Sequence, residues 1–222
     1  MDETSPTVVF DFDLTLTKWD TADRFFRWLL KRQAWRMVLV FGLAPVLAPL
    51  LLFRNTRKFP VRYAVWIATL GLSQEQLRSL VQEHADELFR ESASVFLLEG
   101  LERLQSHLRQ GHRVVIATGC LEILAKEFLG RAGYGHIPLV ASTLQPFLGG
   151  MASHEHCFGP NKIPMLSRRG FAPPWAFTYT DHQCDLPVLK LSAERFLINP
   201  TPKAVRLIQR GLACETTILT WR

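Results

Sequence analysis

The 222-residue sequence contains only four cysteines, and no two of them form a C-x-x-C pair. This scarcity excludes a small disulfide scaffold and favours a reducing, cytosol-facing compartment. Glycine and proline, at 13 each, are too few for a collagen-like or low-complexity chain, and the 48% apolar content excludes intrinsic disorder. The N-terminal segment is acidic and polar, so we expect no secretory signal. We therefore expect one domain, or one domain with an insertion.

Acidic residues are absent between Arg24 and Gln74, a window that holds nine of the 26 Lys and Arg residues. The remaining 17 basic residues face 20 acidic ones, so the rest of the chain has a net charge of −3 although the whole carries +6. A local excess of this kind indicates an anionic partner, either a nucleic acid or an anionic membrane surface.

Charged and hydrogen-bonding side chains are missing from the centre of this window, residues 37–53. A nucleic-acid surface would interleave its basic residues with polar and aromatic ones, so we expect no nucleic-acid partner. Tryptophans and cations flank the apolar run, as the headgroup layer of a membrane favours. At about 1.5 Å per residue the run is too short to span a bilayer, and Pro45 and Pro49 would break a straight helix.

We therefore predict a helix–kink–helix that dips into one leaflet, with a neighbouring helical stretch, residues 61–72, beside it. A buried core helix with a solvated basic edge and two short membrane passes are the alternatives. The residues predicted to contact anionic lipid are Arg32, Arg36, Arg54, Arg57 and Lys58.

Outside the window, short apolar runs alternate with amphipathic segments, which predicts a Rossmann-like, doubly wound parallel α/β sheet. Strands are expected at 7–11, 113–117, 139–142, 175–180 and 195–198, with a hairpin turn at 149–150. Helices are expected at about 73–90, 101–110, 120–129, 161–169 and 201–210. About 80 residues of helical character separate the first two sheet strands. We expect a catalytic core of residues 1–17 and 98–222 and a helical cap of residues 18–97.

Chemistry-bearing residues follow the predicted strands. Asp11 and Asp13 come directly after the first strand, two residues apart, so extended backbone would point both carboxylates the same way. Thr118 and Gly119 end the second strand and open a helix, which suits an anion. Lys162 opens another helix, where one ammonium can meet a phosphate.

The fourth motif, Tyr179-Thr-Asp181-His-Gln-Cys-Asp185, adds two carboxylates after another strand. With these four motifs in this order, the sequence resembles the haloacid dehalogenase-like phosphatases, and within them the branch that contains phosphoserine phosphatase. The segment Arg27-Trp-Leu-Leu-Lys-Arg-Gln33, the paired prolines and the basic exit look similar to the C-type phosphatidylglycerophosphate phosphatases of bacteria.

The resemblance implies a role for each matching residue. Asp11 would be the nucleophile and form an aspartyl-phosphate, and Asp13 would be the general acid and base. Mg²⁺ would be held by Asp11, Asp181 and the main-chain carbonyl of Asp13. The residues implied to bind the phosphoryl oxygens or to support the site are Thr118, Gly119, Lys162, Thr15 and Asp185. The sequence departs from the family pattern where Leu14 replaces a frequent Gly, Thr180 a common Ser, and His182 a Ser or Gly.

The function implied by the resemblance is hydrolysis of phosphatidylglycerophosphate to phosphatidylglycerol at the cytoplasmic face of the bacterial inner membrane. A soluble small-molecule phosphatase of the phosphoserine type is the first alternative. A membrane-bound adaptor that binds phosphate groups without turnover is the second. The expected partners are a phospholipid phosphate and an anionic membrane surface, and the sequence leaves the oligomeric state open.

Overall fold

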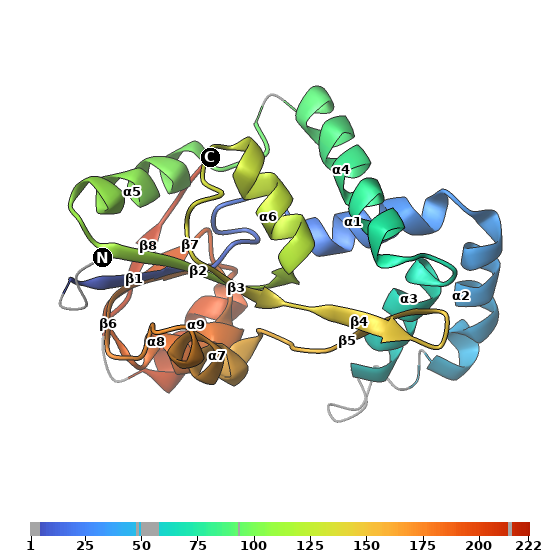
Figure 1. Ribbon diagram of the computed structural model, residues 1–222. Helices are drawn as coiled ribbons and strands as arrows, with labels where there is room; N and C mark the ends of the chain where they lie inside the picture. Colours follow the sequence, from blue (N-terminus) through green and yellow to red (C-terminus); the bar gives the residue numbers. More distant parts are fainter. Residues whose placement is uncertain (1–4, 48, 50–57, 93, 213–214) are drawn as a thin grey trace.

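The computed structural model describes residues 5–47, 49, 58–92, 94–212 and 215–222. At its centre lies a parallel six-stranded sheet with the strand order β3-β2-β1-β6-β7-β8 (Figure 1). The strands are β1 (Thr7–Phe10), β2 (Arg113–Leu121), β3 (Leu139–Ser142), β6 (Trp175–Thr180), β7 (Ser192–Ile198) and β8 (Thr217–Leu219). The predicted parallel α/β architecture is confirmed. The short edge strand β8 was not predicted.

Helices cover both faces of the sheet because its central strands are apolar on both sides. In β1, Val8 and Phe10 pack into one buried cluster and Val9 into another on the opposite face. One face is covered by α5 (Leu98–Arg109) and α6 (Glu122–Arg131) (Figure 1). The other carries α7 (Lys162–Arg168), α8 (Leu186–Leu189), α9 (Pro202–Gly211) and the short 3₁₀ turns η2 (Gly159–Asn161) and η3 (Gln183–Asp185).

Between β1 and α5 the chain forms a group of helices beside the sheet: α1 (Thr21–Lys31), α2 (Ala34–Leu47), α3 (Lys58–Thr69) and α4 (Gln74–Glu91). The two connections to the core lie together, since Thr17 and Phe96 form an antiparallel bridge and Leu97 N donates to Leu16 O at 2.8 Å. Ser73 begins α4 with the predicted capping box. We call residues 18–97 the cap.

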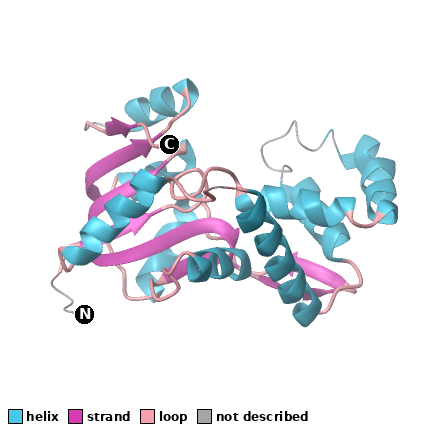
Figure 2. Cartoon of the chain, turned by 90° about the horizontal axis from the view of Figure 1, so that it is seen from above, coloured by secondary structure: helices cyan, strands magenta, loops and turns pink. Residues whose placement is uncertain are grey.

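A β-hairpin from the second half of the chain reaches out to the cap. Its strands, β4 (Leu144–Phe147) and β5 (Gly150–Ser153), extend away from the sheet and lie along α3 (Figures 1 and 2). Met151 N donates to Thr69 Oγ1 at 2.8 Å, and Gly71 N donates to Gly149 O at 2.6 Å. The sequence predicted the hairpin turn, but not its attachment to the cap.

Two local expectations are corrected. The helix expected from Cys120 begins at Glu122, because β2 continues to Leu121 with an irregularity in its pairing after Thr118. In the apolar run, α2 continues through Pro45 to Leu47. Residues 48 and 50–57, which include Arg54 and Arg57, lie outside the described residues. Within the part of the chain that the structure describes, no helix combines the length and apolar character needed to cross a membrane.

Candidate active site

Three neighbouring strands bring the predicted site residues to one edge of the sheet. Phe10 of β1 is in register with Ile116 of β2 and with Tyr179 of β6. Continued by one residue, this register places Asp11 level with Ala117 on one side and Thr180 on the other, with strands spaced about 4.8 Å apart. Thr118 and Asp181 are the next residues along the chain on those two sides. Asp11 N donates to Tyr179 O at 2.9 Å, which fixes the start of the loop that carries Asp13.

Lys162 connects two carboxylates at this edge. The short turn η2 places it at the first position of α7, where it is 3% exposed. Its Nζ donates to Asp11 Oδ1 at 3.0 Å and to Asp185 Oδ2 at 2.7 Å. Thr180 Oγ1 donates to the same oxygen of Asp185 at 2.8 Å. Burial lowers the pKa of Lys162, but the adjacent carboxylates of Asp11 and Asp185 outweigh that effect and raise it, so the ammonium stays charged.

The carboxylates of this cluster outnumber its cation. Burial raises the pKa of Asp11 to about 6, against the opposing effect of Lys162. Burial and the negative charges of Asp11 and Asp185 raise the pKa of Asp181 to about 7. Three carboxylates share one ammonium, so a second positive charge would stabilise their ionised forms. Asp11, Asp181 and the carbonyl of Asp13 are hard oxygen donors and therefore fit the predicted Mg²⁺. Asp11 and Asp181 supply only two side-chain ligands, so the main-chain carbonyl would be needed as well. Among the described residues, no three or more His, Cys, Asp or Glu side chains are grouped so that they could hold a metal ion by themselves.

Asp13 is held by the first residue of the cap helix α1. Thr21 N and Thr21 Oγ1 both donate to Asp13 Oδ1, at 2.9 and 2.6 Å. Cys120 Sγ lies 3.0 Å from Thr21 Oγ1, and because that hydroxyl proton is used on Asp13, the thiol donates to the threonine. Burial and the nearby Asp20 raise the pKa of Asp13 to about 7, while the two bonds from Thr21 oppose that rise. Asp13 can thus exchange a proton near neutral pH.

The phosphate-binding residues predicted on β2 lie next to the acid cluster. Thr118 is buried, and its Oγ1 accepts from Cys120 N at 3.0 Å, so this N–H group is not available to an anion. A side chain at Gly119 would lie 3.3 Å from the Phe158 ring, so glycine allows the close approach of that loop. Thr15, predicted as a supporting residue, is fully buried, and no partner is recorded for its Oγ1 among the described residues.

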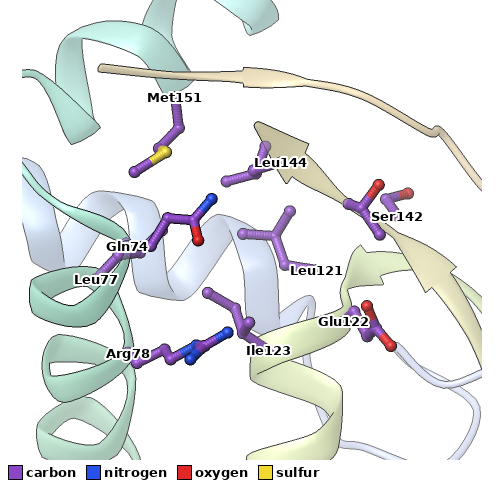
Figure 3. Close-up of a pocket in the computed structure, with 10 residues that line it drawn as sticks. Gln74, Leu77, Arg78, Leu121, Glu122, Ile123, Ser142, Leu144 and Met151 are labelled. Atoms are coloured by element: carbon purple, nitrogen blue, oxygen red, sulfur yellow. The ribbon is translucent and has the colours of Figure 1, made fainter. Parts of the chain in front are cut away.

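A cleft with a volume of about 160 Å³ lies between the cap and the core, beyond the end of β2. Figure 3 shows Gln74 and Arg78 of α4 facing Ile123 across it, with Leu144 and Met151 of the hairpin at its far side. Its core wall includes Leu121 and Glu122, three and four residues after Thr118, but none of the predicted catalytic residues lines it. It offers space for the alcohol part of a phosphate ester.

The predicted lipid-contacting residues are only partly placed at the surface. The prediction for Arg36 is wrong: its side chain is buried, 2% exposed, and its Nη2 donates to Leu70 O at 2.8 Å. Arg32 is exposed, but it pairs with Glu83 at 2.6 Å. The side chain of Lys58 is outside the described set. The exposed side chains of α2 are instead apolar, and they include Trp35, Val38, Leu39 and Phe41.

Sequence reasoning missed Thr21, although the Asp20-Thr21 pair opening a helix after the acid loop was a usable signal. It also missed a buried network in which His107 contacts Tyr179 Oη and His112 Nδ1, each at 2.8 Å. This network lies on the face of the sheet that α5 covers, where Tyr179 stacks on Phe10 at 4.4 Å between ring centroids.

Comparison with known proteins gives a family match over most of the chain. A family model for haloacid dehalogenase-like hydrolases matches residues 8–190. Among solved structures, a protein of unknown function from Bordetella pertussis Tohama I is similar, with a TM-score of 0.70 and 18% identity, over 97% of this chain and 99% of that one. A substrate-bound phosphoserine phosphatase is similar with a TM-score of 0.60 and 14% identity, over 98% and 94%.

A phosphoserine phosphohydrolase-like protein from Francisella tularensis is similar with a TM-score of 0.57 and 13% identity, over 96% and 94%. At these identities the likeness concerns the fold alone.

Proposed function

Because the chain belongs to the haloacid dehalogenase-like hydrolases, we propose that it is a Mg²⁺-dependent phosphomonoesterase whose substrate is a lipid phosphate, phosphatidylglycerophosphate. The observation that carries the phosphatase proposal is the convergence of Asp11, Asp13, Thr118, Lys162 and Asp181 at the carboxyl edge of adjacent strands. Open α/β sheets bind their ligands at this edge.

In the proposed reaction, the Asp11 carboxylate attacks phosphorus, and the bond from phosphorus to the alcohol oxygen breaks. Asp13 gives its proton to the departing alkoxide, which leaves an aspartyl-phosphate on Asp11. Asp13 then takes a proton from water, whose oxygen attacks the same phosphorus and releases phosphate and the free Asp11 carboxylate. Bound Mg²⁺ would neutralise charge between the phosphate dianion and the carboxylates.

The other residues of the site would place a positive charge and hydrogen-bond donors around the phosphoryl group. Ion pairs with Asp185 at 2.7 Å and with Asp11 at 3.0 Å already hold the Lys162 ammonium beside Asp11, so little reorganisation is needed when a phosphoryl group arrives. Thr118 and the Gly119 N–H group would donate to the phosphoryl oxygens from the opposite side of Asp11. The cleft between α4 and α6 would hold the alcohol.

The lipid part of the proposal is supported by the exposed apolar side chains of α2 and by exposed cations on the neighbouring helices, such as Lys31 and Arg62. An exposed apolar helix with cations on its neighbours would suit the interface of an anionic bilayer, at the cytoplasmic face of the inner membrane. One observation favours the soluble phosphoserine-type alternative: the similar solved structures include phosphoserine phosphatases with nearly complete mutual coverage.

A phosphate-release panel separates the two. Purified protein in Mg²⁺ is given phosphatidylglycerophosphate in mixed micelles, phosphoserine and p-nitrophenyl phosphate, with Asp11→Asn as the matched blank of equal shape. We expect the lipid to give the highest kcat/KM and Asp11→Asn to release no phosphate. Efficient hydrolysis of phosphoserine with none of the lipid would establish the soluble alternative.

A further inference from the structure

The tip of the β4–β5 hairpin exposes two large apolar side chains. Phe147 is 52% exposed and Leu148 is 75% exposed, and no other large hydrophobic side chain among the described residues exceeds Leu148. The tip belongs to the second half of the chain, far in sequence from the apolar run of the cap. Packing within this protein therefore does not account for the apolar character of these two side chains.

The backbone makes leucine a poor choice at this position. Leu148 and Gly149 form a two-residue turn with φ values of 43° and 76°, and Phe147 pairs with Gly150 across it. Turns with two positive φ values favour Asn-Gly, because an ordinary side chain is crowded there. Leu148 is thus disfavoured both by its backbone conformation and by its exposure to water. Such a residue is retained at functional positions when its side chain has a partner.

The cap holds the tip rigidly. Trp66 Nε1 of α3 lies 3.1 Å from Phe147 O and 3.3 Å from Leu148 O and donates to these carbonyls. Gly150 packs so closely that a Cβ there would lie 2.9 Å from Trp66 O. These contacts use the backbone of the turn and leave both apolar side chains directed outward.

The exposed apolar face of α2 lies in the same part of the molecule. Val38 and Phe41 are 69% and 66% exposed, and α2 packs on α3, the helix that binds the hairpin. Figures 1 and 2 both place α2, α3 and the hairpin tip at the end of the molecule away from the core helices. The protein therefore presents apolar groups from two distant parts of its sequence at one end.

We propose that residues 147–148 are a second membrane-insertion element, which enters the apolar layer of an anionic bilayer together with the exposed face of α2. The inference deepens the proposed lipid-phosphatase function and rests on it. A bilayer is the occupant that the structure favours, because a narrow tip of two side chains offers far less than the roughly 800 Å² that each partner buries in a stable protein interface. The neighbouring cap helices supply exposed cations, among them Lys31 and Arg62, that complement anionic headgroups.

Insertion of the tip would also orient the substrate cleft. Leu144 and Met151, on the two strands of the hairpin, line the cleft between cap and core. The hairpin therefore runs from the proposed membrane contact to the proposed place of the alcohol group.

The test measures sedimentation with vesicles of phosphatidylglycerol and phosphatidylcholine. Leu148→Asn removes the apolar side chain and suits the turn, so we expect about a tenfold lower partition coefficient with no loss of melting temperature. Leu98→Asn is the matched control, since Leu98 is 62% exposed at the start of α5 on the core. We expect the control to bind vesicles as the wild type does. Turnover of p-nitrophenyl phosphate should be unchanged in both variants.

Equal vesicle binding by Leu148→Asn and wild type would overturn the insertion proposal, even if the lipid is hydrolysed in micelles. So would a wild-type dimer in light scattering that becomes monomeric in Leu148→Asn, because the tip would then contact a second copy. Vesicle binding that depends on Leu148, combined with no phosphate release from the lipid, would support the inserted tip and refute the proposed substrate.

Discussion

Replacing Thr21 with valine tests whether the cap controls Asp13, the proposed general acid. The substitution keeps the shape of the side chain and deletes only the hydroxyl that donates to Asp13 Oδ1 at 2.6 Å. A hydrogen bond to a charged group contributes about 1.5–3 kcal/mol. Thr21 N still donates to the same oxygen at 2.9 Å, so Asp13 stays partly oriented. We therefore expect the lower end of that range, a loss of about tenfold in kcat/KM.

The assay compares two leaving groups. An alkyl phosphate needs a proton from Asp13 as its alkoxide departs, whereas p-nitrophenolate leaves without one. If Thr21 positions the acid, Thr21→Val should lose about tenfold in kcat/KM with the alkyl phosphate and less than about threefold with p-nitrophenyl phosphate. Thr21→Ser retains the hydroxyl and should recover most of the loss.

A uniform loss with both substrates would refute this reasoning, because it would indicate a general disturbance of the site. The same conclusion would follow if Thr21→Ser behaved like Thr21→Val. Cys120→Ala provides a separate control for the buried contact of Cys120 Sγ with Thr21 Oγ1 at 3.0 Å. It should change kcat/KM less than Thr21→Val, because the bond from Thr21 to Asp13 remains.

Four further outcomes follow from the structure. Lys162→Met should abolish phosphate release, and urea unfolding should show a free energy of unfolding lower by about 3–5 kcal/mol, because two buried ion pairs are lost. The double variant that adds Asp185→Asn should recover part of that stability. Unchanged stability would contradict the contribution of the buried ion pairs. The rise in melting temperature on adding Mg²⁺ should grow as the pH increases through about 6 to about 7, because protons compete for Asp11 and Asp181; a pH-independent rise would contradict it. Burial lowers the pKa of His84 to about 4, so below a pH of about 6.5 the imidazole of the unfolded chain is protonated while that of the folded chain is not. The free energy of unfolding therefore falls as the pH drops below about 6.5. His84→Leu should reduce that fall in thermal melts, and an unchanged pH profile would contradict this prediction. Leu14→Gly should raise the melting temperature by relieving a positive φ of 57°, whereas a decrease would show that the Leu14 side chain stabilises the loop.

Much of the core could be predicted because its strands are buried on both faces. The expected bounds of β3 and β6, 139–142 and 175–180, coincide with the observed strands. Strand order then determines the site, since polar residues after parallel strands meet at one edge of the sheet. The grouping of Asp11, Lys162 and Asp185 thus follows from local sequence and topology together.

The remaining features depend on contacts that local sequence does not specify. Arginine is rarely buried, so the expectation for Arg36 was exposure, yet the carbonyl of Leu70 and the ring of Trp35 accommodate its guanidinium. The capping pattern of α1 is visible, but its position against Asp13 depends on how the cap packs. Attachment of the hairpin to the cap relies on backbone groups, such as Gly149 O, which accepts from Gly71 N, and such partners leave no periodic signal in the sequence.

Two leucines, one in the loop that carries Asp13 and one at the hairpin tip, share an unfavourable backbone conformation. Leu14 and Leu148 both have positive φ values, of 57° and 43°, and both are exposed. At each position the backbone favours glycine or asparagine, and at neither does core packing account for an apolar side chain. Contact with an apolar partner outside the chain would explain both, one beside Asp13 and the other at the hairpin tip. Under the proposed function, a lipid phosphate held at a bilayer surface would supply such a partner at both places, whereas a small polar substrate would supply it at neither.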